Sequence, residues 1–291
     1  MKGEENLWRI LGDKFEMLRA AQRWAEARRV GATALELARR AFPEHHPSLA
    51  LSYERLGQIH DICGERAEAK PCLARALHII EQIEPLDHRA IYRIARRLGY
   101  LCDAAGGDEE AIIFYEKAIA AASQLENIRH ADLGPMLNNL ALIYRRSGRQ
   151  KAAETYYLQA LELYEKQLGP DHPDIAAVLN NLGVFYTNEG QLEKAEQMHE
   201  RALAIRRRVH PRGHSDVAQS HCNLAVVYHS RGDLKRAADL YQESLRAWEE
   251  VERPPEDYEI VASNYASLLR SLGKKRQAAT IESRARKRRR L

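Results

Sequence analysis

Apolar residues recur along the chain with the period of an α-helix, and these apolar stripes come in pairs. Leu137, Leu140 and Tyr144 fall at i, i+3 and i+7, which places them on one helical face. A second stripe covers residues 157–161, and the first pattern returns 42 residues later, over residues 179–186. No segment shows the strict alternation of a half-buried strand. The pattern therefore predicts an all-α chain built from repeated pairs of helices.

Three residue types repeat in the same register. Glycines stand 42 residues apart, with 41 for the last interval: Gly64, Gly106, Gly148, Gly190, Gly232 and Gly273. An alanine follows five residues after each glycine: Ala69, Ala111, Ala153, Ala195, Ala237 and Ala278. Histidines keep the same period: His46, His88, His130, His172 and His214. Such self-similarity is the signature of a repeat protein.

Each repeated position has a structural explanation. The glycine is expected to end the first helix of a pair in the left-handed conformation, and the alanine lets the two helices approach closely. One pair cannot bury both of its apolar faces, so neighbouring pairs must stack as a solenoid. The first unit is degenerate, because Gln22 replaces the glycine and Lys14 replaces a leucine. The predicted units are 1–42, 43–85, 86–127, 128–169, 170–211, 212–252 and 253–283, followed by a basic tail at 284–291.

The best-preserved motifs resemble a known family. Residues 180–186 read Asn-Asn-Leu-Gly-Val-Phe-Tyr, and residues 190–195 read Gly-Gln-Leu-Glu-Lys-Ala. Both resemble the tetratricopeptide repeat (TPR). The 42-residue period and the Gly-Pro-Asp-His-Pro segment at 169–173 resemble its kinesin-light-chain type. The resemblance implies a right-handed superhelical solenoid of about seven antiparallel helix pairs. It also implies a scaffold that holds an extended peptide or a partner domain on a concave face lined by the first helices of the pairs.

Two neighbouring registers on the first helices carry most of the candidate binding residues; Arg93 lies one turn earlier, and Arg145 and Arg146 lie at the end of a first helix. Asparagine offers a donor and an acceptor to a peptide unit, and arginine offers a planar fork to a carboxylate. The predicted peptide-binding residues are Arg55, Arg93, Arg96, Arg97, Asn138, Asn139, Arg145, Arg146, Asn180, Asn181, Asn223 and Asn264. The arginines favour an acidic ligand. For the asparagines an equal alternative is a structural bond between neighbouring helices.

The sequence contains no recognisable catalytic or metal-binding set. P-loop, GxSxG, HExxH and strand-borne GxGxxG motifs are all missing. Histidines one repeat apart lie too far from one another to share an ion, so they are expected to support helix starts, as are Asp132, Asp174 and Asp216. The four cysteines have no CxxC spacing and are expected to be small buried apolar residues. We therefore predict no enzyme activity, no cofactor and no metal.

Charge and hydropathy leave two further classes of function open. The formal net charge is +4, and six basic residues lie among the last eight, so the tail could contact nucleic acid; its alternative is the end of a capping helix. Trp8 and Phe15 in the degenerate first unit suggest an incompletely covered end and self-assembly, giving either a monomer or an end-to-end oligomer. No apolar run is long enough to span a membrane. We expect a cytoplasmic protein-interaction scaffold.

Overall fold

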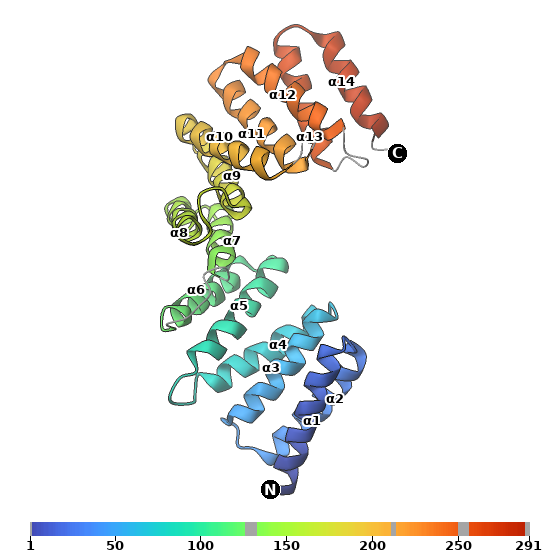
Figure 1. The fold of residues 1–291 in the computed structure, drawn as a ribbon, viewed down its shortest axis with the longest axis vertical. Helices are drawn as coiled ribbons and strands as arrows, with labels where there is room; N and C mark the ends of the chain where they lie inside the picture. Colours follow the sequence, from blue (N-terminus) through green and yellow to red (C-terminus); the bar gives the residue numbers. More distant parts are fainter. Residues whose placement is uncertain (1, 126–132, 211–213, 250–255, 289–291) are drawn as a thin grey trace. The chain divides into compact units, whose positions relative to one another are not determined.

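The computed structural model describes residues 2–125, 133–210, 214–249 and 256–288. These residues form fourteen helices and no strand (Figure 1). The helices are α1 (Lys2–Ala20), α2 (Trp24–Ala41), α3 (Pro47–Ile62), α4 (Arg66–Ile80), α5 (His88–Ala104), α6 (Asp108–Ala122), α7 (Leu133–Arg146), α8 (Gln150–Leu168), α9 (Pro173–Asn188), α10 (Leu192–Val209), α11 (Ser215–Arg231), α12 (Leu234–Glu249), α13 (Glu256–Ser271) and α14 (Lys275–Arg288). None of the described helices has the length and apolar character needed to cross a membrane.

Consecutive helices pair as the sequence predicts. Each predicted unit contains one helix pair, whose first member we call helix A and whose second we call helix B. The pairs are grouped into two compact units, residues 1–136 and residues 137–291, with the boundary inside α7. One predicted boundary is wrong. Residues 284–288 are not a tail beyond the solenoid but the last turn of α14, and Ala285 within them is buried.

Small residues at the crossing of helices A and B set the packing inside each pair. The alanines five residues after the repeated glycines have no exposed surface: Ala69, Ala111, Ala153, Ala195, Ala237 and Ala278. On the facing helix A, Gly183 lies so close to His199 that an added Cβ would sit 2.6 Å from the imidazole Cε1. Gly99 lies equally close to Tyr115. Close backbone approach therefore explains this second set of glycines.

The histidine register has the structural role that the sequence suggests. His46, His172 and His214 are the N-cap residues of α3, α9 and α11. In each case the imidazole Nδ1 accepts a hydrogen bond from the backbone N–H two residues later, at 3.1–3.2 Å. In α5 the cap is Asp87, one residue before His88. The aspartates Asp174 and Asp216 are first-turn acids, which suit the positive end of the helix. His130 and Asp132 lie outside the described residues.

Helices A end as expected, with one exception. All six repeated glycines have positive φ, from 72° at Gly190 to 83° at Gly232. In the degenerate first repeat (residues 1–42), Gln22 takes the position of the glycine with φ 56°. A side chain there bears strain that glycine avoids. The backbone turn is thus kept even where its preferred residue is missing.

The cysteines fit the expectation only in part. All four are free. Cys102 and Cys222 are buried and Cys72 is half-buried, but Cys63 is exposed at the end of α3. The expectation of burial is therefore wrong for Cys63.

Candidate functional site on the A helices

In the first compact unit (residues 1–136), three of the predicted arginines form ion pairs between neighbouring A helices. Arg55 Nε lies 3.0 Å from Glu16 Oε1, and Arg97 pairs with Asp61. Arg93 donates two hydrogen bonds to Glu54, one of them 2.8 Å long. These contacts join α1 to α3 and α3 to α5.

In the Arg93–Glu54 and Arg97–Asp61 ion pairs, the carboxylate is buried more deeply than the arginine. The side chain of Glu54 is 3% exposed and that of Arg93 44% exposed; the values for Asp61 and Arg97 are 5% and 43%. The Glu54 carboxylate raises the pKa of Arg93 above its ordinary value. Each of these arginines faces an acid on the neighbouring helix. The positive field expected from this cluster is therefore much reduced.

In the second compact unit (residues 137–291), hydrogen bonds between side-chain amides replace the ion pairs. Asn181 Nδ2 donates to Asn138 Oδ1 at 3.0 Å, and Asn223 Nδ2 donates to Asn180 Oδ1 at 2.7 Å. The third bond of the series joins Asn264 to the thiol of Cys222. Burial raises the pKa of this thiol to about 12, although the hydrogen bond with Asn264 acts in the opposite direction. We call these three contacts the amide ladder. The structural alternative for the asparagines is thus present in the fold.

The amide ladder leaves half of each donor asparagine unused. Asn181, Asn223 and Asn264 each turn the amide nitrogen toward the preceding helix A, and all three residues are partly exposed. Among the described residues, no donor is bonded to the Oδ1 atoms of Asn181 or Asn223. One turn further on, Val184 and Val226 are also partly exposed. The result is a row of amide oxygens beside two valines, with one oxygen on α9 and one on α11.

Arg206 completes the polar network and was not foreseen. It is 6% exposed, and its Nη1 donates to the carbonyl oxygen of Asp216 at 2.9 Å and to Ser220 Oγ at 2.8 Å. Burial lowers its pKa from the ordinary value. The signal was available in the repeat: 42 residues away on either side stand Tyr164 and Trp248, both buried. A charged residue in a buried register indicates a polar contact there.

At the last turn of α7, Arg145 and Arg146 differ in their surroundings. Arg145 is half-buried, and its Nε has no hydrogen-bond partner among the described residues. Its positive charge lies close enough to Tyr157 to oppose the rise in the pKa of that phenol to about 12, which burial causes. Arg146 is exposed. Both therefore bring positive charge to the second unit, near the start of the amide ladder.

One cluster offers metal-ligating atoms, but ring stacking explains it. His210, His214 and Asp216 can each present an atom within 4.8 Å of the others. The two imidazoles are stacked, with centroids 3.7 Å apart and planes 8° apart. Ligand lone pairs lie in the ring plane, so parallel rings cannot both face one ion. Phe42 and His46 stack in the same way in the first unit, where a phenyl ring replaces the first imidazole.

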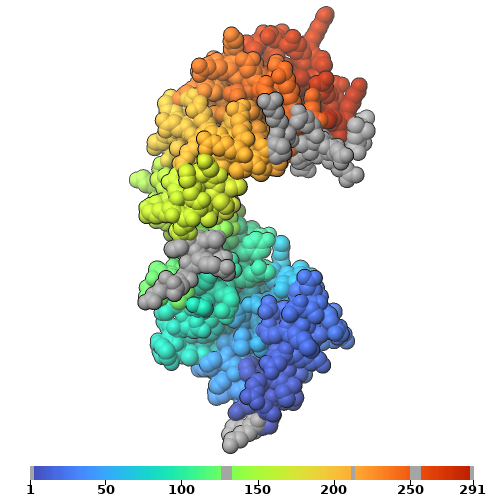
Figure 2. All heavy atoms as spheres, viewed as in Figure 1, coloured from blue at the N-terminus to red at the C-terminus, as the bar shows by residue number. Residues whose placement is uncertain are grey.

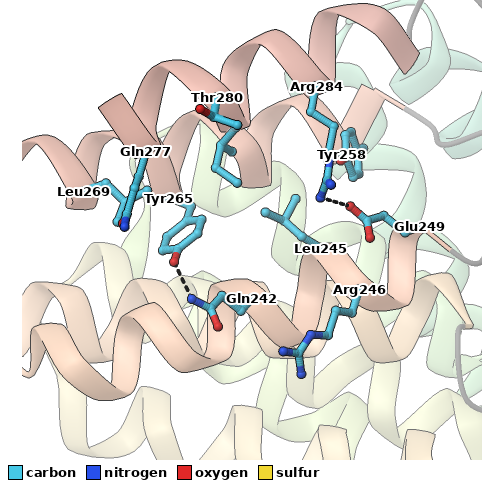
Figure 3. Close-up of a pocket in the computed structure, with 11 residues that line it drawn as sticks. Gln242, Leu245, Arg246, Glu249, Tyr258, Tyr265, Leu269, Gln277, Thr280 and Arg284 are labelled. Atoms are coloured by element: carbon cyan, nitrogen blue, oxygen red, sulfur yellow. Dashed lines mark hydrogen bonds and ion pairs between the residues drawn. The ribbon is translucent and has the colours of Figure 1, made fainter. Parts of the chain in front are cut away.

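A second candidate surface lies between successive B helices. A hollow of about 420 Å³ lies between α12 and α14, and residues of α13 also line it. Figure 3 shows Leu245, Tyr258 and Tyr265 at its apolar wall, with Gln242 Nε2 donating to the Tyr265 hydroxyl at 2.7 Å. A similar hollow of about 430 Å³ lies between α10 and α12. Successive B helices thus border two depressions that the sequence did not predict.

The predicted basic tail is partly used in packing. Arg284 pairs with Glu249 at 2.9 Å across the hollow (Figure 3). Arg288 donates to the carbonyl oxygens of Trp248 and Glu249, and its guanidinium lies over the Tyr258 ring. Residues 289–291 lie outside the described part of the chain. The alternative of a basic end to a capping helix holds for residues 284–288.

Comparison with known proteins connects this geometry to a family. The profile of the tetratricopeptide repeat matches residues 16–82, 132–208, 174–250 and 216–290. A crystal structure of BtubC (BKLC) from P. vanneervenii has 27% sequence identity and a TM-score of 0.61, covering 80% of this chain and 95% of that one. A putative kinesin light chain from Podosopora anserina has 22% identity and a TM-score of 0.59, covering 72% and 99%. YrrB, described as a TPR protein with an unusual peptide-binding site, has 19% identity and a TM-score of 0.50, covering 69% and 87%. A search of curated proteins finds no match.

Proposed function

Because the chain belongs to the tetratricopeptide repeat family, we propose that it is a protein-interaction scaffold whose second unit holds an extended segment of a partner protein against its A helices. The amide ladder carries this proposal. Asn181 and Asn223 use their amide donors inside the fold, and each keeps its Oδ1 acceptor on a partly exposed residue. Backbone N–H groups are the donors that every partner segment offers, whatever its sequence.

The spacing of the ladder suits an extended chain. Packed helices lie about 8–10 Å apart. An extended chain in the polyproline II conformation rises about 3.1 Å per residue with three residues per turn, so every third N–H group faces the same side. Successive ladder oxygens therefore match the N–H groups of roughly every third residue. The side chains between them are expected to be apolar or small, because Val184 and Val226 border the row.

The preference for acidic residues is expected at one end of this row. Arg145 and Arg146 lie at the end of α7, on the same unit as the asparagines. Acidic residues of the partner segment are proposed to lie there. In the first unit, by contrast, Arg55, Arg93 and Arg97 already face acids. We therefore propose a modest acidic preference, supported by Arg145, whose Nε has no hydrogen-bond partner among the described residues. It involves about one charge contact and a loss of affinity of a few-fold or less at high salt.

A matched pair of variants tests the role of the ladder. The probe is a peptide selected from a random-sequence display library on the purified chain, and its dissociation constant is measured by calorimetry. Asn138→Ala and Asn181→Ala break the same ladder bond, but only Asn181→Ala removes the outward oxygen. We expect Asn181→Ala to weaken binding about fivefold, the equivalent of one hydrogen bond of about 1 kcal/mol, and Asn138→Ala to weaken it much less. Equal losses in both variants would show that the asparagines act only through the fold.

A third variant separates the two candidate surfaces. Thr280 is exposed and lines the hollow between α12 and α14, so Thr280→Arg fills that hollow without disturbing the core. Peptide binding that survives Thr280→Arg and declines when every third peptide nitrogen is methylated supports the ladder. Binding that is lost in Thr280→Arg and indifferent to methylation places the ligand on the B helices and contradicts the proposal.

The compartment is part of the same proposal. All four cysteines are free, including the exposed Cys63. Unpaired surface thiols suit a reducing environment. This supports a cytoplasmic location.

A further inference from the structure

The first helix presents an apolar stripe that nothing in the described chain covers. Leu7, Ile10 and Met17 on α1 are 49%, 53% and 63% exposed. Their spacing of three and seven residues places them on one side of the helix, with the exposed Lys14 between them. On the other side, Phe15 is buried in the core, and the Trp8 indole N–H donates to Ser52 at 2.8 Å. The exposed apolar residues of α1 are thus Leu7, Ile10 and Met17 and not Trp8 and Phe15, which the sequence suggested.

The second helix extends this surface. Val30 and Leu37 are one heptad apart on α2 and only partly buried. They lie on the side of α2 opposite Arg28 and Arg39, whose side chains reach Glu65 and Tyr53 of the next pair. The blue atoms of α1 and α2 lie at the edge of the first unit (Figure 2). Val30 also packs against the buried cluster that contains Phe15, and the exposed residues beside it on α2 include the polar Thr33 and Arg40. The apolar surface is therefore the α1 stripe with Val30 and Leu37 at its edge, which we call the first-pair face.

The α1 stripe is complementary to itself. If a second α1 packs antiparallel about a twofold axis near residue 12, Leu7 meets Met17 of the other copy and Ile10 meets its Lys14. Gly3 meets Ala21 in the same arrangement. A twofold interface requires such reciprocity, because each residue of one copy must fit its counterpart in the other. Lys14 can lay its aliphatic stem on Ile10 while its ammonium group reaches solvent or the other copy's Asp13.

The chemistry of the last helix pair argues against a head-to-tail assembly. Among the described residues of α14, only Ala278 and Ala285 are buried. The exposed residues of this helix include Lys275, Arg276, Arg284, Arg286 and Lys287. On α13 the side that would face a further helix A carries the exposed Ser263, Ser267 and Arg270, with Ile260 as its one exposed large apolar residue among those described. A polar, basic face does not match an apolar stripe.

We propose that the chain forms a twofold-symmetric dimer through its first-pair face, with the two α1 helices antiparallel. The helices α1 and α2 have 19 and 18 residues, so each is about 28 Å long and about 10 Å wide. Even the full width of both helices, about 560 Å² per copy, lies below the roughly 800 Å² of a standard interface. The dimer is accordingly reversible, and its dissociation constant falls in the micromolar range.

Sedimentation equilibrium of the full chain across about two decades of concentration around the micromolar range tests the dimer. We expect the mass to rise from that of one chain to that of two. Leu7→Glu and Met17→Lys should each weaken association at least tenfold, because each places a charge against an apolar partner. Ile113 on α6, 58% exposed in the same unit, supplies the matched control: Ile113→Glu should leave association unchanged.

Mixing the two variants tests the antiparallel register. In an equimolar mixture of Leu7→Glu and Met17→Lys chains, one contact becomes a Glu–Lys pair and the other remains Leu–Met, so the dimer should return. All variants lie at exposed positions, and an unchanged circular dichroism spectrum confirms that α1 is folded. A wild-type chain that stays monomeric, an Ile113→Glu chain that loses association, or a mixture that does not recover would each overturn the proposal. So would masses that grow beyond two chains, which indicate a head-to-tail array.

Discussion

Acidification should destabilise the second unit through two buried histidines, His199 and His221. His199 is 1% exposed, and burial together with the charge of Arg206 lowers its pKa from 6.5 to about 4. His221 is 5% exposed, and burial together with Arg207 lowers its pKa to about 4 as well. The Nδ1 atoms of both rings have no hydrogen-bond partner among the described residues. Both rings are therefore neutral in the folded chain at neutral pH.

The sign and size of the effect follow from proton linkage. Because the folded pKa is lower than the unfolded one, the unfolded chain binds more protons between pH 6.5 and pH 4, and stability falls as the pH falls through that window. Each pKa unit corresponds to about 1.36 kcal/mol. Acidification from pH 7.5 to pH 4.5 should thus cost about 2–3 kcal/mol per histidine. Carboxylates whose pKa is lowered, such as those of Glu65 and Glu110, contribute only below their ordinary 4.5.

The repeat itself supplies substitutions that remove the titration without removing the packing. Tyr115 occupies the register of His199 and packs over Gly99 as His199 packs over Gly183, so His199→Tyr is a matched variant. The assay is urea unfolding followed by circular dichroism at intervals from pH 7.5 to pH 4.5. We expect His199→Tyr to lose about half as much stability over this range as the wild type. If the two pH profiles coincide, His199 does not have the buried, neutral state described above.

Three further predictions concern stability and are measured by urea unfolding at neutral pH. Gly190→Val should destabilise the chain by about 1–3 kcal/mol, because φ is 72° while nothing lies within 4 Å of the added Cβ; an unchanged unfolding midpoint would contradict a pure backbone cost. Gln22→Gly should stabilise it by about 0.5–1 kcal/mol by relieving the strain at φ 56°, and a loss of stability would show that the side chain matters more than the backbone. Arg93→Met should cost about 2–3 kcal/mol, more than Glu54→Met, because it leaves the buried carboxylate unpaired whereas the half-exposed arginine can return to water; equal costs would refute this asymmetry.

Periodicity predicts those features that every repeat must share. The left-handed glycines, the fully buried alanines and the histidine caps each occupy positions set by one helix pair and its connection. Their residue types are dictated by local geometry, so they recur with the 42-residue period and can be read without a structure, apart from α5, where Asp87 is the cap. The seven helix pairs follow from them.

Contacts between neighbouring repeats are harder to predict, because each partner varies independently. Arg55 reaches Glu16 and Arg93 reaches Glu54, both 39 residues earlier, whereas Arg97 reaches Asp61, 36 residues earlier. These offsets depend on how adjacent A helices stack and on how far a long side chain extends. Sequence alone therefore identifies an arginine-rich face but not the acids that neutralise it.

The different chemistry of the contacts between A helices explains why the second unit is the better candidate for ligand binding. An ion pair such as Arg93–Glu54 brings both charges together, so its formation reduces the field available to a ligand. An asparagine carries a donor and an acceptor on the same amide, so a contact such as Asn181–Asn138 uses one group and leaves the other. The first unit thus gains inter-helix contacts at the expense of its recognition groups, while the second gains the same contacts and keeps an acceptor on each donor asparagine. Replacing an ion pair by an amide pair therefore keeps the contact between the helices and leaves an amide oxygen, which is the acceptor that the proposed binding surface uses.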